Sequence, residues 1–114
     1  MAYETSGKNL MLNALGDACT YAALFTDDVG TTEVTGGAPA YARKAITFAA
    51  ADAGSMAANG TLPAFDVPAC TVKAIGLMSA VTAGTKYVTI NVTDEVFAAQ
   101  GTYTITAGTL DLNA

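Results

Sequence analysis

The sequence predicts a mainly β protein: a single small antiparallel β-sandwich or barrel, jelly-roll-like, with one short N-terminal helix. Several short β-compatible runs are separated by turn-forming residues, and a single segment has helical spacing. The length of 114 residues fits one domain, and the hydrophobic fraction of 52% can fill a core. We expect residues 1–16 to form an N-terminal arm that carries the helix, and residues 17–114 to form the β domain.

The helix is predicted at the start of the chain. Its apolar residues recur at helical spacing, at Leu10, Met11, Ala14 and Leu15. Ser6 can cap its first turn, and Gly16 is placed to end it. The pattern therefore predicts a helix over about residues 6–16.

The segments up to residue 60 read as strands joined by long loops. Residues 20–26 are a β-compatible run, and residues 27–39 are rich in turn formers, which indicates a long loop or loose hairpin. Residues 41–50 alternate, which predicts a strand, and residues 51–60 read as a second loop. One face of that strand would carry Ala42, Lys44, Ile46 and Phe48, and the other Tyr41, Arg43, Ala45 and Thr47.

The remaining strands are predicted from alternation and from prolines. Residues 61–68 are extended and bracketed by Pro63 and Pro68, which suits an edge strand. Residues 71–78 read as a strand and residues 79–85 as a turn.

Two further runs complete the predicted fold. Residues 86–93 alternate cleanly, which places the side chains of Val88, Ile90 and Val92 inward. Residues 94–101 read as a link, with one helical turn as an alternative. Residues 102–113 read as the final strand, whose apolar residues change parity around Gly108, as a β-bulge there would require.

Composition and charge exclude several classes of protein. The formal charge of −5 comes from scattered acids without a basic stripe, so we expect no nucleic-acid partner. No run approaches the roughly 20 apolar residues of a membrane helix, and no signal peptide is evident, so we expect synthesis in a cytoplasm and no membrane partner. Cys19 and Cys70 are expected as free thiols, although a single bridge stays open.

No constellation of residues indicates catalysis. The chain has no histidine, the commonest general base and metal ligand. Asp94 and Glu95 are adjacent, so in a strand they would point to opposite faces. Asp27, Asp28 and Glu33 could approach a calcium ion from one loop, but the order of EF-hand ligands is absent. We therefore expect no enzyme, no cofactor and no metal site.

The segment 36–48 is the strongest candidate for a contact. Gly36 and Gly37 permit a tight reversal before the strand, and Arg43 and Lys44 are two of the five basic residues in the chain. The planar guanidinium of Arg43 suits a carboxylate. An internal salt bridge and a contact with another subunit are both open for Arg43.

Four segments of the chain resemble a family of small tailed-bacteriophage virion proteins. They are Ala23 to Thr26, Gly36 to Arg43, Phe65 to Ala69, and Gly76 to Gly84. The resemblance covers roughly residues 20 to 90. It implies a non-enzymatic virion component, made in the bacterial host cytoplasm and placed on the surface of the phage particle.

The resemblance leaves the place of the chain in the virion open. We expect a capsid decoration protein that bridges and stabilises major capsid subunits on the outer head surface. The alternatives are a tail-fibre or tail-tip component, and a carbohydrate-binding module for the host surface. The partners would be the major capsid protein or tail proteins. We also expect the chain to form a homo-oligomer, for which a trimer is one option. The expected contact residues are Tyr3, Lys8, Leu10, Tyr41, Arg43 and Lys44.

Overall fold

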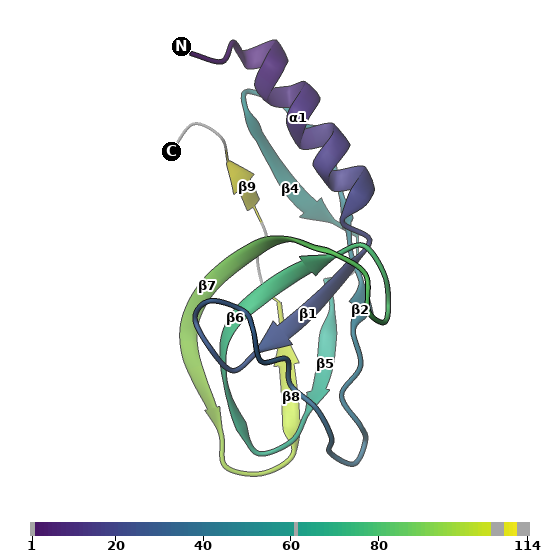
Figure 1. The fold of residues 1–114 in the computed structure, drawn as a ribbon, viewed down its shortest axis with the longest axis vertical. Helices are drawn as coiled ribbons and strands as arrows, with labels where there is room; N and C mark the ends of the chain where they lie inside the picture. Colours follow the sequence, from purple (N-terminus) through teal and green to yellow (C-terminus); the bar gives the residue numbers. More distant parts are fainter. Residues whose placement is uncertain (1, 61, 106–108, 112–114) are drawn as a thin grey trace.

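The computed structural model describes residues 2–60, 62–105 and 109–111. Within them it contains one helix and nine strands, and every strand pair is antiparallel, which confirms the predicted mainly β class. The molecule is elongated, with principal extents of 46 × 23 × 21 Å. Helix α1 (Thr5–Ala18) lies beside β4 (Ser55–Asn59) at one end, and most strands form a body at the other (Figure 1).

The helix differs from its prediction in both its ends and its buried face. Glu4, not Ser6, occupies the N-cap position, and the helix runs two residues beyond Gly16. Leu12 is the buried residue of α1, whereas Leu10 and Met11 are exposed. The helix is thus rotated about its axis relative to the prediction. Two asparagines cause this, because they hold the Leu12 side of the helix against the segment before β4.

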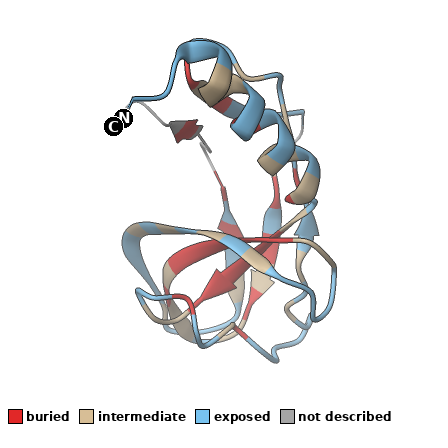
Figure 2. Ribbon diagram, turned by 45° about the horizontal axis from the view of Figure 1, so that its top comes forward, coloured by how far each residue is buried: buried red, intermediate tan, exposed pale blue. Residues whose placement is uncertain are grey.

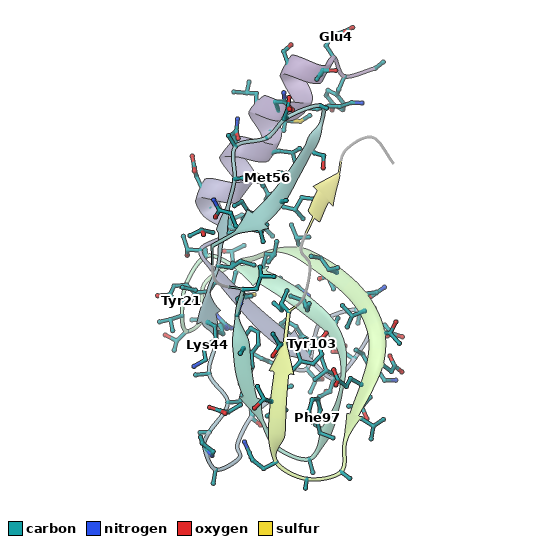
Figure 3. All side chains as sticks on the ribbon, turned by 180° about the vertical axis from the view of Figure 1, so that it is seen from behind. Glu4, Tyr21, Lys44, Met56, Phe97 and Tyr103 are labelled. Carbon is teal, nitrogen blue, oxygen red and sulfur yellow. The ribbon has the colours of Figure 1, made fainter. Side chains whose placement is uncertain are left out.

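These two asparagines bind backbone amides of the segment that precedes β4. The side-chain oxygen of Asn9 accepts a hydrogen bond from Gly54 N at 2.9 Å, and that of Asn13 accepts one from Ala51 N at 2.8 Å. Met56 of β4 packs against the same side of α1, where a Cβ added at Gly16 would lie 2.9 Å from its sulfur (Figure 3). The helix is therefore fixed to the β structure by polar and apolar contacts together.

The main sheet has four strands in the order β2-β1-β6-β7. They are β1 (Tyr21–Phe25), β2 (Lys44–Ala45), β6 (Cys70–Met78) and β7 (Lys86–Phe97). The central strands β1 and β6 are almost wholly buried, while β7 alternates between half-buried and exposed residues over most of its length. Val88, Ile90 and Val92 pack against the core, as their alternation predicts.

Two smaller sheets complete the fold. β5 (Ala64–Val67) pairs with β8 (Gly101–Thr104), and β4 is the middle strand between β3 (Thr47–Phe48) and β9 (Thr109–Asp111). Buried side chains of β1 and β6 meet those of β5 and β8 in one core, which continues to Leu12 of α1. Figure 2 shows these buried residues running along the inner strands, with exposed residues on the outer turns.

Several sequence predictions of loops and strands are also wrong. Residues 51–60 are not a loop throughout, because Ser55–Asn59 forms β4. Its alanines have low strand propensity, but hydrogen bonds to strands on both sides hold it extended. Residues 94–101 are not a link throughout, because β7 continues to Phe97 past a shift in register opposite Val72 and Ala74. The expected strand 41–50 is divided between β2 and β3, which belong to different sheets.

The final strand is also divided, into β8 and β9. The bulge predicted at Gly108 lies outside the described residues. Cys19 is buried and Cys70 half-buried, and both are free thiols, as expected. No helix in the described ranges is both long and apolar enough to span a bilayer.

Candidate functional site

The best-defined polar cluster surrounds Arg43. Its Nε and Nη2 atoms donate to the two carboxylate oxygens of Glu33, each at 2.9 Å. Its Nη1 atom donates to the carbonyl oxygens of Ala80 at 2.9 Å and Ala83 at 2.7 Å. The side chain is only 10% exposed. One guanidinium thus joins the loop after β1, the run that leads into β2, and the turn between β6 and β7.

Tyr41 belongs to the same cluster and connects it to the main sheet. Its hydroxyl donates to Glu33 Oε2 at 2.8 Å and accepts a hydrogen bond from Leu24 N at 2.9 Å. Its ring stacks on Phe65 of β5, with 6.2 Å between the ring centroids. Tyr41 therefore lies between the polar cluster and the core, and it orients the carboxylate that Arg43 binds.

The electrostatics of the cluster follow from these contacts. Burial acts to raise the pKa of the Glu33 carboxyl, but hydrogen bonds from Arg43 and Tyr41 outweigh it and hold that pKa below its usual value. Burial raises the pKa of the Tyr41 phenol, and the neighbouring Glu33 raises it further. Near neutral pH Glu33 is therefore ionised, Arg43 is charged and Tyr41 is neutral. Glu33 and Arg43 form an internal ion pair, to which the Tyr41 hydroxyl donates a hydrogen bond.

A second group of hydrogen bonds orders the loop after β1. The carboxylate of Asp27 accepts hydrogen bonds from Thr31 N at 3.0 Å, from Thr32 N at 2.9 Å and from the Thr31 hydroxyl. The Thr31 hydroxyl is the main cause of a lowered pKa of about 2 for Asp27. Asp27 and Glu33 thus serve the loop itself, and no group of three or more metal-ligating side chains is present among the described residues.

Two surface hollows lie next to these elements. One of about 360 Å³ lies over the cluster and is lined by Glu33, Tyr41, Arg43 and Val81, among other residues. The other, of about 540 Å³, lies between the C-terminal half of α1 and β3, and its wall includes Cys19, Phe48 and Met56. The guanidinium N–H groups of Arg43 in the first hollow already bind protein oxygens. This hollow therefore lies over an internal ion pair whose donors are in use.

The structure divides the six predicted contact residues between two places. Tyr41 and Arg43 come together at Glu33, while the side chain of the neighbouring Lys44 is exposed. Tyr3 and Leu10 are 57% and 72% exposed at the N-terminal end of the molecule, and Lys8 is half-buried in α1. Figure 3 shows that Glu4, beside Tyr3, lies far along the molecule from Lys44. Arg43 forms the internal salt bridge that the sequence left open, and contact with another subunit stays a prediction for all six residues.

Sequence reasoning missed the partners of Arg43. Glu33 lies ten positions before it in a turn-rich loop, and the carbonyl groups of Ala80 and Ala83 carry no side-chain signal. It also missed a contact on the other face of the main sheet. There the Lys86 ammonium lies 4.9 Å from the centroid of the Phe25 ring and donates to the carbonyl oxygens of Val29 and Gly30.

The fold and these sites define a class of protein: a small, mainly β chain whose charged clusters hold its own loops in place. A family model described as "Podophage GP4 fiber I protein gp80" matches residues 5–113. The chain belongs to this family of bacteriophage fibre proteins, which confirms the expected phage virion family. No curated protein and no solved structure matches the chain.

Proposed function

We propose that this chain is a non-enzymatic structural component of a phage fibre, located in the virion, and that it works by contact with neighbouring virion proteins. The observation that carries the proposal is the fibre-family match over residues 5–113, which includes the helix and all of the described strands. Its partners would be other tail proteins and further copies of the chain.

The surface supports a role in contacts. Only 13% of the residues are charged, and several large apolar side chains are exposed on different elements. Val29 and Val96 are 70% and 73% exposed, on the loop after β1 and on β7. Such scattered apolar residues are ordinary on a protein surface, but the low fraction of charged residues leaves the surface less guarded against association, which favours a subunit of an assembly.

The rigidity of the loops supports the same role. The Arg43 cluster and the Asp27 hydrogen bonds fix the loop after β1, and Arg43 also fixes the turn after β6. Fixed loops lose little conformational entropy when they form a contact, which favours assembly.

Capsid decoration is the second candidate. The low charge and the dispersed exposed apolar side chains would equally suit a protein that bridges neighbouring capsid subunits. In that role the chain would stabilise the assembled shell, because it would bind only the assembled state.

Gold-labelled antibodies against the purified chain, applied to intact virions of the phage that encodes it, test the proposal. The fibre role predicts label on appendages and none on the head shell. Label spread over the head would favour decoration, and absence of label from virions that do contain other fibre proteins would reject both. Antibody pre-absorbed with the recombinant chain is the control.

A further inference from the structure

The chain contains one asparagine that is followed by glycine, and both residues are exposed. Among the five asparagines of the sequence, only Asn59 precedes a residue without a side chain. Asn59 is the last residue of β4, and Gly60 lies in the bend that follows it. The side-chain amide of Asn59 is therefore in contact with water and next to a backbone nitrogen that no Cβ shields.

The space around Gly60 is open. Apart from neighbours in the chain, a Cβ added at this glycine would meet only the hydroxyl oxygen of Thr47 among the described residues, at 3.9 Å. The nitrogen of Gly60 can thus move toward the Asn59 side chain without displacing another segment. Closure of a five-membered ring between the two residues requires this approach, and the absence of a side chain on glycine lowers its steric cost.

We propose that Asn59–Gly60 is a site of spontaneous deamidation, and that the hydroxyl group of Thr47 limits its rate. The backbone amide of Gly60 loses its proton to hydroxide, and its nitrogen attacks Cγ of Asn59. The new N–C bond closes a succinimide ring, while the Cγ–Nδ2 bond breaks and Nδ2 leaves as ammonia with a proton taken from water. Water then opens the ring at either carbonyl carbon, which gives aspartate or isoaspartate at position 59.

Thr47 of β3 holds the Asn59 amide in the folded protein. Thr47 and Asn59 are directly opposite each other in the β3–β4 pair, and the Thr47 hydroxyl donates to Asn59 Oδ1 at 2.7 Å. An extended backbone at Asn59 keeps the nitrogen of Gly60 out of line with Cγ, so the reaction waits until this end of the pair opens. The pair opens readily, because β3 has only two residues and both of its pairings lie near the end of β4.

The products would alter the small sheet in two ways. Either carboxylate adds a negative charge to a chain whose formal charge is already −5. Isoaspartate also adds one carbon atom to the main chain, so position 59 no longer matches Thr47, and only the pair of Phe48 with Ala58 remains. The modified chain should therefore keep its fold but lose the outer part of β3. This inference does not depend on the fibre role, because it concerns a reaction of the chain with water.

Peptide mapping by mass spectrometry, on the folded chain sampled over time at mildly alkaline pH, tests the proposal. Asn59 should convert to aspartate and isoaspartate about tenfold or more faster than Asn91, which is also exposed in a strand but precedes valine. The rate at Asn59 should rise with pH, because the attacking amide must lose its proton. An Asn59 that stays intact, or that converts no faster than Asn91, would overturn the proposal.

Two variants of Thr47 test its part in the reaction. Thr47→Val keeps the shape of an exposed side chain but removes its hydroxyl group, so the fold should tolerate it. Loss of this hydrogen bond should speed deamidation of Asn59 by about two- to tenfold. Thr47→Ser keeps the hydroxyl group and is the matched control, with the rate of the wild type. A Thr47→Val variant that deamidates no faster than the wild type would overturn the role of Thr47.

Discussion

At Arg43, one guanidinium binds a carboxylate and two carbonyl oxygens from segments far apart in the sequence. Its bidentate contact with Glu33 has N–O distances of 2.9 Å, and both side chains are largely buried, at 10% and 25% exposed. Burial reduces screening by water but also removes the hydration of both charges, so the largest effect is expected when one partner is removed and the other charge stays buried without it. The cluster therefore holds three segments of the fold together, and this role does not depend on a contact with another virion protein.

Replacement of Arg43 by alanine should lower the free energy of unfolding by about 2–4 kcal/mol, because Glu33 would lose its counter-charge and two carbonyl groups would lose their donor. The unfolding free energy of Arg43→Lys should lie between those of the wild type and Arg43→Ala, since an ammonium cannot make the bidentate contact. Urea denaturation at pH 7 measures both. The neighbouring exposed Lys44→Ala is the control and should change stability by less than about 0.5 kcal/mol. Equal losses for Arg43→Ala and Lys44→Ala would contradict this account.

Tyr41 should make the protein sensitive to alkali. Burial raises its pKa in the folded state, so the unfolded chain, with a phenol pKa of about 10, loses this proton first. The stabilisation is full below pH of about 10 and is lost as pH rises toward the folded pKa. Tyr41→Phe removes this titration, so its unfolding free energy should fall less steeply than that of the wild type between pH 9 and 11.5.

The variant should also be less stable than the wild type at pH 7, because Leu24 N loses its acceptor and Glu33 a donor. Tyr87→Phe, which removes the same hydroxyl group from an exposed ring, is the control. Parallel alkaline slopes for the wild type and Tyr41→Phe would show that Tyr41 does not carry this dependence.

Among the elements, a glycine in β6 leaves space that an aromatic ring from β1 fills. Ala23 pairs with Gly76, and the ring of Phe25 covers the glycine, so that an added Cβ would clash with this ring and lie 3.1 Å from Cδ of Lys86. The same ring lies under the Lys86 ammonium. A glycine within a buried strand thus makes room for an aromatic side chain that closes the second face of the sheet.

The change Gly76→Ala should destabilise the fold by about 1–3 kcal/mol, because the Phe25 ring must leave its position or the strands must separate. The opposite sign is expected for Gly7→Ala in α1, where an added Cβ meets nothing within 4 Å and alanine favours the helix. Thermal unfolding at low protein concentration compares the two. A neutral Gly76→Ala would show that Phe25 relaxes freely.

Strong periodic patterns made most of the strands predictable. Val88, Ile90 and Val92 alternate and pack on the core as expected, and residues 20–26 and 71–78 contain β1 and β6. β4 was not predictable, because its alanines and Ser55 resemble a loop and its extended form depends on hydrogen bonds to distant strands.

The orientation of α1 was not predictable either. Two apolar stripes compete on this helix, and Asn9 and Asn13, which select the inner one, bind backbone groups whose place only the fold determines. The candidate site shows the same limit, since Tyr41 and Arg43 stood out in the sequence but their partner Glu33 did not.

Across the whole molecule, the main core joins the helix to the sheets along an elongated shape of 46 × 23 × 21 Å (Figure 1), and a smaller buried cluster surrounds Phe25. The expectation of a phage virion family, drawn from strand and turn residues, is confirmed by the fibre-family match. The place of the chain in the virion could not be derived from residues alone, because head and tail proteins use the same contact chemistry.

The copy number of the chain per purified virion tests the central claim most directly. Quantitative mass spectrometry with isotope-labelled peptides of this chain and of the major capsid protein gives the ratio. A fibre component should be present in far fewer copies than the major capsid protein and should leave the particle when fibres are sheared off. A ratio near one to one that persists in fibreless heads would contradict the fibre role and assign the chain to the capsid surface.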